Sequence, residues 1–245
     1  METSKENYPE LLSLAVHELR GPAGVVIGWL RMLQKDTDSS LSSQHRKMID
    51  EAAKSCARLN AVVEELSDVG KLDGGRLSLK RQPTDAFSLV AEVADLVQDV
   101  DDRGVRLEVR GPADGARLPG DVVLLRKAFD AVFRAILREK PRHCTVVAER
   151  RIEQIHGLRS AIVIVAEEAS VHAAYDRAPG PFNERRGGVG LGLPLARRVI
   201  EGHGGRIWAP VAQAGTPEPV DGGQSPDPLT RGSAIISLPI TEWSR

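Results

Sequence analysis

The first 75 residues carry an apolar repeat that long helices produce and strands do not. Over two stretches, apolar residues recur at alternating intervals of three and four. They are Leu12, Val16, Leu19, Ala23, Val26, Leu30 and Leu33 in the first stretch, and Ile49, Ala52, Cys56, Leu59, Val63 and Leu66 in the second. The polar run between them, residues 36–40, marks a turn. This spacing predicts two long antiparallel helices.

Two helices alone cannot enclose a core, because one side of each apolar seam stays in contact with water. Pairing two hairpins into a four-helix bundle buries both seams. We therefore predict a homodimer.

The rest of the chain has mixed structure. Residues 1–75 hold only two of the 15 prolines and six of the 23 glycines, so turns concentrate further along. The pattern predicts helices over 85–100, 121–140 (capped by Asp121) and 191–202, and strands over 105–109, 145–152, 160–166, 206–209 and 234–238. The prediction is an α+β chain, with a helical hairpin over residues 1–78 and a two-layer α/β sandwich over residues 79–245.

Composition excludes several classes of function. The chain has 33 Lys and Arg against 34 Asp and Glu, which argues against nucleic acid as a partner. Its longest apolar run, residues 161–166, is far shorter than the ~20 residues that cross a bilayer, so we expect no direct membrane insertion. Two cysteines, Cys56 and Cys144, are too few for a disulfide framework or a multi-cysteine metal site. We expect a soluble, cytoplasmic protein without a metal site of its own.

His17 is a candidate nucleophile. It follows the seam residue Val16, which places it on the flank of the first helix, within reach of solvent. A neutral imidazole attacks phosphorus readily, and the adjacent Glu18 carboxylate could hold its tautomer or accept its proton. Pro22 should bend the helix one turn further on. A surface histidine beside a glutamate is common, so this pair alone does not define a site.

A glycine-rich run, residues 187–192, opens the last predicted helix. Glycines let backbone N–H groups approach a phosphate, and a helix N-terminus favours an anion. The spacing matches neither the dinucleotide-binding fingerprint nor a P-loop, so a flexible hinge is an equally simple interpretation.

Taken together, these motifs resemble those of sensor histidine kinases. Residues 17–22 (His-Glu-Leu-Arg-Gly-Pro) resemble the phosphoacceptor motif of the dimerisation and histidine-phosphotransfer domain, and residues 72–77 (Leu-Asp-Gly-Gly-Arg-Leu) the junction that follows it. Residues 188–193 (Gly-Val-Gly-Leu-Gly-Leu) resemble the second glycine box, and residues 203–208 (His-Gly-Gly-Arg-Ile-Trp) the next helix-to-strand turn. Pro181 and Phe182 stand where the family often has a phenylalanine motif.

The resemblance implies a fold, a set of site residues and partners. The second segment would adopt the ATP-binding sandwich shared with gyrase, Hsp90 and MutL. His17 would accept a phosphoryl group with help from Glu18, and the partner would be the receiver domain of a response regulator. The implied nucleotide-binding residues are Glu167, Gly188, Gly190, Leu191 and Gly192.

The sequence departs from the family where Mg²⁺ and ATP would bind. Aligning residues 125–129 with the family's helix puts Ala131 and Ala135 in place of two asparagines, and alanine has no oxygen to ligate a cation. After the buried strand, Glu167 keeps the base-binding carboxylate, one methylene longer, but Ala169 and Val171 replace two glycines. Either the chain is a divergent, competent kinase, or its use of Mg²⁺-ATP is impaired.

A further departure concerns dephosphorylation of the regulator. Gly21 stands four residues after His17, where many members have Thr or Asn. Glycine has no side chain to orient a water molecule, so we expect weak phosphatase activity.

Three functions fit these observations. The leading one is a two-component histidine kinase core that is phosphorylated on His17 and passes the phosphoryl group to a response-regulator aspartate. The second is a histidine phosphotransferase with a vestigial ATP domain, and the third is a pseudokinase scaffold. The input signal would come from a separate sensor or kinase protein, or from a segment outside this sequence, or the chain would sense no signal.

Overall fold

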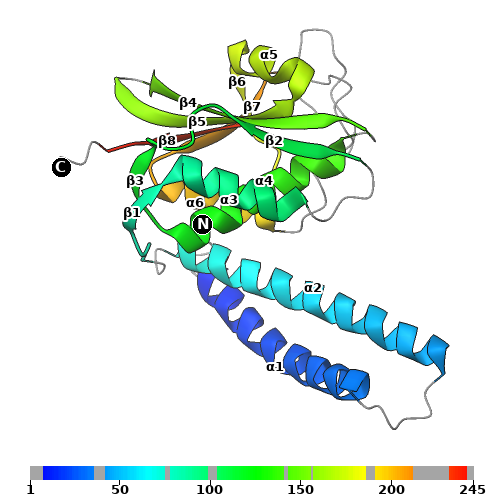
Figure 1. Cartoon of the computed structure of the whole chain (residues 1–245). Helices are drawn as coiled ribbons and strands as arrows, with labels where there is room; N and C mark the ends of the chain where they lie inside the picture. The colour runs from blue at the N-terminus through cyan, green and yellow to red at the C-terminus, as the bar shows by residue number, and fades with distance from the viewer. Residues whose placement is uncertain are drawn as a thin grey trace. The chain divides into compact units, whose positions relative to one another are not determined.

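The computed structural model describes residues 8–35, 42–74, 78–98, 104–140, 143–155, 157–185, 191–211 and 232–241. The chain divides into two compact units, Met1–Ser78 and Leu79–Arg245. Each unit is considered by itself (Figure 1).

The first unit is the expected hairpin of two long helices. Helix α1 spans Tyr8–Lys35 and helix α2 spans Ser43–Asp73. The hydroxyl of Ser42 caps α2 by accepting a hydrogen bond from the backbone N–H of His45 at 3.2 Å. The helices approach closely at Gly70, where a Cβ atom would lie 2.8 Å from Cδ2 of Leu12. The sequence therefore folds locally as its spacing predicts.

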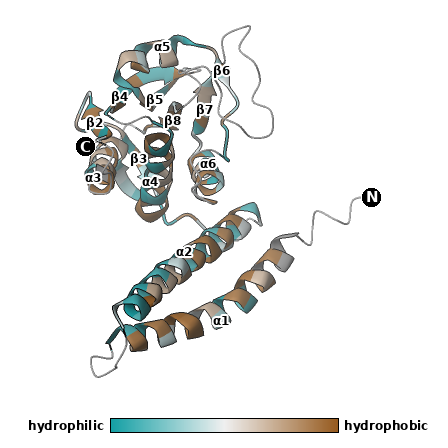
Figure 2. Ribbon diagram, turned by 90° about the vertical axis from the view of Figure 1, so that its right-hand side faces the viewer, coloured by the Kyte–Doolittle hydropathy of each residue, from teal (hydrophilic) through white to brown (hydrophobic). Residues whose placement is uncertain are grey.

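Much of the apolar surface of the hairpin is not buried within the chain. Val16 and Val63 are buried between the helices, but the seam residues Leu19, Val26, Leu33 and Leu59 are exposed. Hydrophobic residues recur along both helices, as the brown segments of the ribbon show (Figure 2). Six large apolar residues of the hairpin outside the predicted seam are also exposed: Leu14, Val25, Trp29, Met32, Met48 and Val62. In the described ranges, no helix combines the length and hydropathy that a membrane span requires.

The second unit is built on a six-stranded mixed sheet with the strand order β2-β4-β5-β8-β7-β6. Its strands are β2 (Arg106–Arg110), β4 (Thr145–Ile155), β5 (Leu158–Glu167), β6 (Pro179–Gly180), β7 (Arg206–Pro210) and β8 (Ala234–Pro239). The β2–β4 pair is parallel and the other pairs are antiparallel. The run 161–166 is fully buried on the central strand β5, with helices on one face of the sheet (Figure 1).

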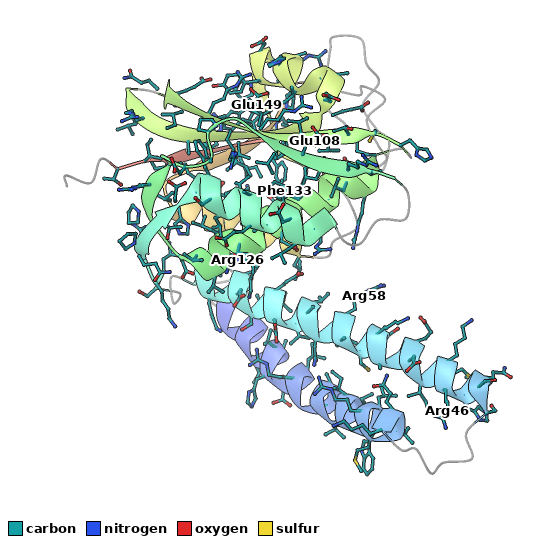
Figure 3. The ribbon with its side chains drawn as sticks, viewed as in Figure 1. Arg46, Arg58, Glu108, Arg126, Phe133 and Glu149 are labelled. Carbon is teal, nitrogen blue, oxygen red and sulfur yellow. The ribbon has the colours of Figure 1, made fainter. Side chains whose placement is uncertain are left out.

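Three helices form the layer beneath the sheet: α3 (Ala86–Gln98), α4 (Val122–Glu139) and α6 (Gly192–Gly202). Asp121 caps α4 as predicted, because its carboxylate accepts from the N–H of Leu124 at 3.2 Å. Phe129 and Phe133 of α4 are fully buried and stack with ring centroids 6.2 Å apart. Charged side chains such as Glu108 and Glu149 come from the sheet (Figure 3).

A short helix that was not predicted from the sequence, α5 (Val171–Asp176), covers part of the opposite face of the sheet. It follows a 3-10 turn, η1 (Glu168–Ser170). Val171 and Ala174 pack into an apolar cluster with Ile162, Ile164 and Trp208. The sandwich is thus two layers with a partial third.

A second departure lies before α4. The stretch between the predicted strand 105–109 and the predicted helix 121–140 contains β3 (Arg117–Gly120), which pairs with β1 (Gln82–Asp85); neither strand was predicted. Asp85 ends β1 instead of beginning a helix, and its carboxylate accepts from the N–H groups of Phe87 and Gly115 at 2.9 and 2.7 Å. One carboxylate therefore caps α3 and fixes the start of β3.

Candidate functional site

His17 lies on an exposed position of α1, as its place beside the seam predicts. The preceding residue, Val16, is buried against α2, so the backbone at this turn is anchored while the imidazole remains in solvent. Glu18 is exposed as well. Pro22 lies inside α1, one turn further on. The arrangement leaves the imidazole accessible to a macromolecular phosphoryl donor or acceptor.

The other predicted site residues belong to the second unit. Glu167 is the last residue of β5, and Leu191 and Gly192 lie where α6 begins. Gly188 and Gly190 lie outside the described residues. The structure therefore places three of the five implied nucleotide-binding residues, in the unit that does not contain His17 and Glu18.

Glu167 has a partner that sequence reasoning missed. Its Oε2 lies 3.6 Å from Nζ of Lys140, the residue that ends α4. The Lys140 side chain is only 4% exposed, whereas that of Glu167 is 38% exposed. Burial lowers the pKa of the Lys140 ammonium, and the charges of Glu167 and then Cys144 act in the opposite direction. The carboxylate expected to meet a nucleotide base is thus bound to a buried cation of the same chain.

Helix α4 presents methyl groups where the resemblance implies asparagines. Ala131 and Ala135 are both buried. Arg134 lies between them, and its Nε donates to both carboxylate oxygens of Asp130 at 2.9 Å. The guanidinium thus has a carboxylate partner one turn back on the same helix.

The backbone after Glu167 is helical and does not form a glycine loop. Val171 has φ −57° and ψ −43°. A valine takes this conformation without strain, so the replacement of glycine carries no backbone penalty here. Its side chain is instead fixed in the apolar cluster beneath α5.

The middle of α6 carries two charge pairs. Nε of Arg197 lies 2.6 Å from Oε1 of Glu184, and Nη1 of Arg198 lies 3.9 Å from Oε2 of the same carboxylate. Glu184 thereby joins the segment after β6 to α6.

His203, in the motif at the end of α6, is buried and forms a junction with α4. Its Nε2 accepts from the N–H of Asp121 at 2.9 Å, and its Nδ1 lies 2.6 Å from the carbonyl of Val199. The Asp121 carboxylate also accepts from the N–H of Lys80 at 2.9 Å. Burial lowers the pKa of His203. This junction ties the first residues of the second unit to the ends of two helices.

The described residues do not fit Mg²⁺-ATP held as the resemblance implies. Helix α4 offers no side-chain oxygen at Ala131 or Ala135, and the Glu167 carboxylate is paired with Lys140. Among the described residues, no group of three or more His, Cys, Asp or Glu side chains could hold a metal ion.

Comparisons with known proteins agree with the resemblance. Residues 10–75 match the His Kinase A (phospho-acceptor) domain. The chain is 27% identical over 224 residues to the sensor protein GacS of Pseudomonas syringae pv. syringae, covering 81% of this chain and 23% of that protein. It is 26% identical over 209 residues to the signal transduction histidine-protein kinase BarA of Escherichia coli K12, covering 81% and 22%. The chain thus spans less than a quarter of the length of these relatives.

Two solved structures share the fold. Full-length ShkA in complex with AMPPNP has a TM-score of 0.66 at 19% identity, over 97% of this chain and 47% of that one. The Acinetobacter baumannii histidine kinase AdeS has a TM-score of 0.52 at 17% identity, over 92% and 98%. Residues 10–75 thus match a phospho-acceptor domain, and over most of its length the chain is similar to sensor histidine kinases of two-component systems.

Proposed function

We propose that His17 is the phosphoacceptor of this chain and that the phosphoryl group passes between it and an aspartate on the receiver domain of a response regulator. The observation that carries the proposal is the exposed imidazole of His17 on α1, within the stretch that matches the phospho-acceptor domain. A receiver domain is large, and an exposed helix flank gives its aspartate access to the ring.

The transfer needs only a nucleophile and a proton acceptor from this chain. One imidazole nitrogen attacks the phosphorus of an aspartyl phosphate, so that a P–N bond forms. The bond from phosphorus to the aspartyl oxygen breaks, and the carboxylate leaves with the electron pair. The ring proton moves from the other nitrogen to the Glu18 carboxylate. The reverse sequence delivers the phosphoryl group to a receiver aspartate.

The proposal includes a homodimer. Between α1 and α2 lies a groove of about 310 Å³ whose lining includes Ile27, Leu30 and Ala57. Trp29 and Met32 of α1 do not line this groove but are exposed as well. A second hairpin would bury this surface in a four-helix bundle.

A histidine phosphotransferase is the second candidate. It is favoured by the ion pair between Lys140 and Glu167 and by the alanines at positions 131 and 135. In this case the phosphoryl group reaches His17 from a phosphorylated receiver domain, and the second unit serves as a docking surface. The candidates differ in the phosphoryl donor and share the acceptor. A pseudokinase scaffold is the third, and it has no use for the His17 side chain.

The test offers the purified chain two labelled donors: γ-labelled ATP with Mg²⁺, and receiver domains of its own organism labelled with a small acyl phosphate. Acid-labile label on the chain is measured for the native protein and for His17→Gln. His45→Gln is the matched control, because His45 is an exposed histidine of α2.

We expect label on the native chain and on His45→Gln but not on His17→Gln. Label from ATP identifies a competent autokinase, and label from receivers alone identifies the phosphotransferase. The proposal is refuted if the folded native chain takes label from neither donor, or if the His17→Gln variant is labelled as strongly as the native chain. The scaffold is then the remaining candidate.

A further inference from the structure

Three elements that are distant in sequence meet at the end of the sheet where β5 stops. They are the end of α4, which contributes Lys140, the end of β5, which contributes Glu167, and the residue Gly232 just before β8. This end of the sheet is the place where the family resemblance expects a nucleotide base.

The two charges of this ion pair have unequal access to water. The Lys140 side chain is 4% exposed, so its ammonium depends on protein partners for compensation. The Glu167 side chain is 38% exposed and can be hydrated. Removing the counter-charge from a buried cation is costly, whereas a half-exposed carboxylate that loses its partner keeps its hydration. The ion pair therefore restrains the Glu167 side chain mainly because the buried Lys140 ammonium needs a nearby negative charge.

The fold makes room for the lysine. A Cβ atom on Gly232 would lie 2.8 Å from Cε and 3.0 Å from Nζ of Lys140, and Gly232 has a φ of +69°. Glycine is the residue that both accepts this backbone conformation and leaves space for the ammonium. Lys140 is thus enclosed by its neighbours and is not a surface side chain folded over by chance.

The consequence concerns base recognition. A carboxylate recognises adenine by accepting a hydrogen bond from the exocyclic amine. The Lys140 ammonium, 3.6 Å from Oε2, attracts the same carboxylate, so the lysine and the base compete for the position of Glu167. A base that recruits Glu167 must draw the carboxylate away from the ammonium of an almost fully buried side chain.

We propose that Lys140 is a built-in competitor for the base-recognition carboxylate. Its buried ammonium attracts the Glu167 carboxylate, and an adenine nucleotide must draw that carboxylate away before it can bind. Loss of the Lys140 charge therefore strengthens the binding of adenine nucleotides. The inference rests on the base-binding role that the family resemblance implies for Glu167, which belongs to the autokinase form of the proposed function, and it is independent of the chemistry at His17.

The test measures AMPPNP binding to the full chain by titration calorimetry, which reads nucleotide affinity without any phosphoryl transfer. The variants are Lys140→Met, which removes the charge, and Lys127→Met, the matched control at an exposed lysine of the same helix. Glu167→Gln and the double variant Lys140→Met/Glu167→Gln show whether any gain depends on the carboxylate. GMPPNP is the second probe, because guanine carries a carbonyl oxygen where adenine carries the amine.

We expect Lys140→Met to bind AMPPNP at least tenfold more tightly than the native chain, with no change for Lys127→Met. The gain should vanish in the double variant and should be absent for GMPPNP. An affinity of Lys140→Met within twofold of native overturns the proposal, as does an equal gain for both nucleotides. Lys140→Gln carries the same expectation and replaces Lys140→Met if circular dichroism shows that the latter is unfolded.

The outcome separates this inference from the proposed function. Tighter AMPPNP binding by Lys140→Met, together with an unlabelled His17, supports the role of Lys140 and refutes the phosphoacceptor. A labelled His17, together with an AMPPNP affinity that is unchanged in Lys140→Met, supports the phosphoacceptor and refutes the role of Lys140.

Discussion

His203 is a buried histidine whose ionisation the folded protein opposes. Both ring nitrogens are engaged, one by the N–H of Asp121 and one by the carbonyl of Val199, so a second ring proton would break the contact with Asp121. Because its pKa is lowered from the ordinary 6.5, the unfolded chain takes up the proton first as the pH falls. The contribution of neutral His203 to stability is complete above the unfolded pKa and is lost progressively below it.

We therefore expect the melting temperature of the second unit to fall as the pH is lowered below about 6.5. His203→Gln should be less stable at neutral pH but should lose part of this pH dependence. His45→Gln, which changes an exposed histidine, should keep the native profile. Parallel profiles for the native chain and His203→Gln would contradict this role.

Gly232 offers a separate test of the space around Lys140. Gly232→Ala combines strain at a φ of +69° with a clash against the lysine, whereas Gly157→Ala has a φ of +80° and open space around the new methyl group. Left-handed strain alone costs about 1–3 kcal/mol. Urea unfolding should show a larger loss for Gly232→Ala than for Gly157→Ala, and equal losses would mean that Lys140 moves aside freely.

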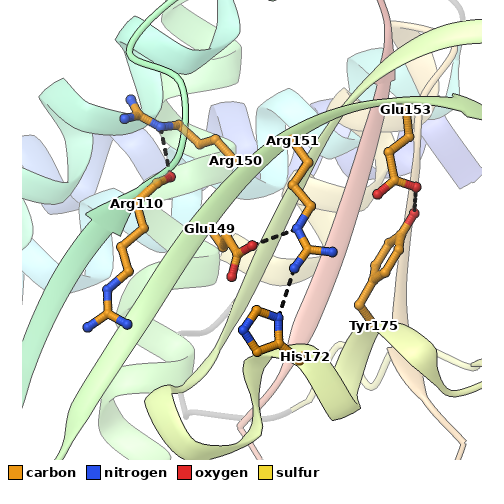
Figure 4. A network of polar contacts seen from close by, with 7 residues as sticks. All are labelled: Arg110, Glu149, Arg150, Arg151, Glu153, His172 and Tyr175. Atoms are coloured by element: carbon orange, nitrogen blue, oxygen red, sulfur yellow. Dashed lines mark hydrogen bonds and ion pairs between the residues drawn. The ribbon is translucent and has the colours of Figure 1, made fainter.

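Helix α5 is only six residues long, and polar contacts help to hold it on the sheet. Arg151 of β4 donates to Glu149 at 2.6 Å, contacts Nδ1 of His172 at 2.9 Å and lies 5.5 Å from the ring centroid of Tyr175 (Figure 4). The Tyr175 hydroxyl donates to Glu153, and burial together with this bond raises the pKa of Tyr175 to about 12. Helix α5 is thus held by polar contacts around its apolar side.

We expect Arg151→Ala to destabilise the second unit by about 1–2 kcal/mol in urea unfolding, because one change removes three contacts to α5 and its surroundings. Arg106→Ala, at an exposed position on β2, should cost less than about 0.5 kcal/mol. A difference between the two smaller than the experimental error would mean that apolar packing alone docks α5.

The elements that the sequence predicted are those with a strong local signal. The hairpin has a seam of many turns, α4 has a capping aspartate, and β5 has a continuous apolar run. The elements missed are held by tertiary contacts: β1 and β3 exist because they pair with each other, and α5 exists because the sheet offers it an apolar face. For the same reason, the exposed position of His17 on α1 could be predicted from neighbouring residues, but the ion pair joining residues 140 and 167 could not.

The exposed apolar surface of the hairpin bears on the oligomeric state of the chain. Trp29 and Met32 on α1 are 62% and 63% exposed, which is unfavourable in water for side chains of this size. We expect the full chain to have a mass in light scattering of about twice 26.5 kDa. The double variant Trp29→Glu/Met32→Glu should shift it toward the monomer.

Leu158→Glu provides the control for this prediction. Leu158 is 64% exposed, but it lies in the second unit, so its replacement should leave the mass unchanged. A native chain that is monomeric at micromolar concentration would refute the dimer, and a similar loss of mass in both variants would place the interface elsewhere.

Helix α1 contains Gly21, Gly24 and Gly28 as well as Pro22. Apart from the adjoining residues and the backbone of the helix itself, no heavy atom of the described residues lies within 4 Å of where the Cβ atoms of these glycines would be. Each glycine disfavours a helix by about 1 kcal/mol relative to alanine, and an interior proline by about 3 kcal/mol. A segment so poor in intrinsic helicity depends on a neighbour to stay wound. In the proposed dimer, dilution should therefore unwind the turns after His17 as it separates the two copies, so that assembly and the order of α1 become one equilibrium.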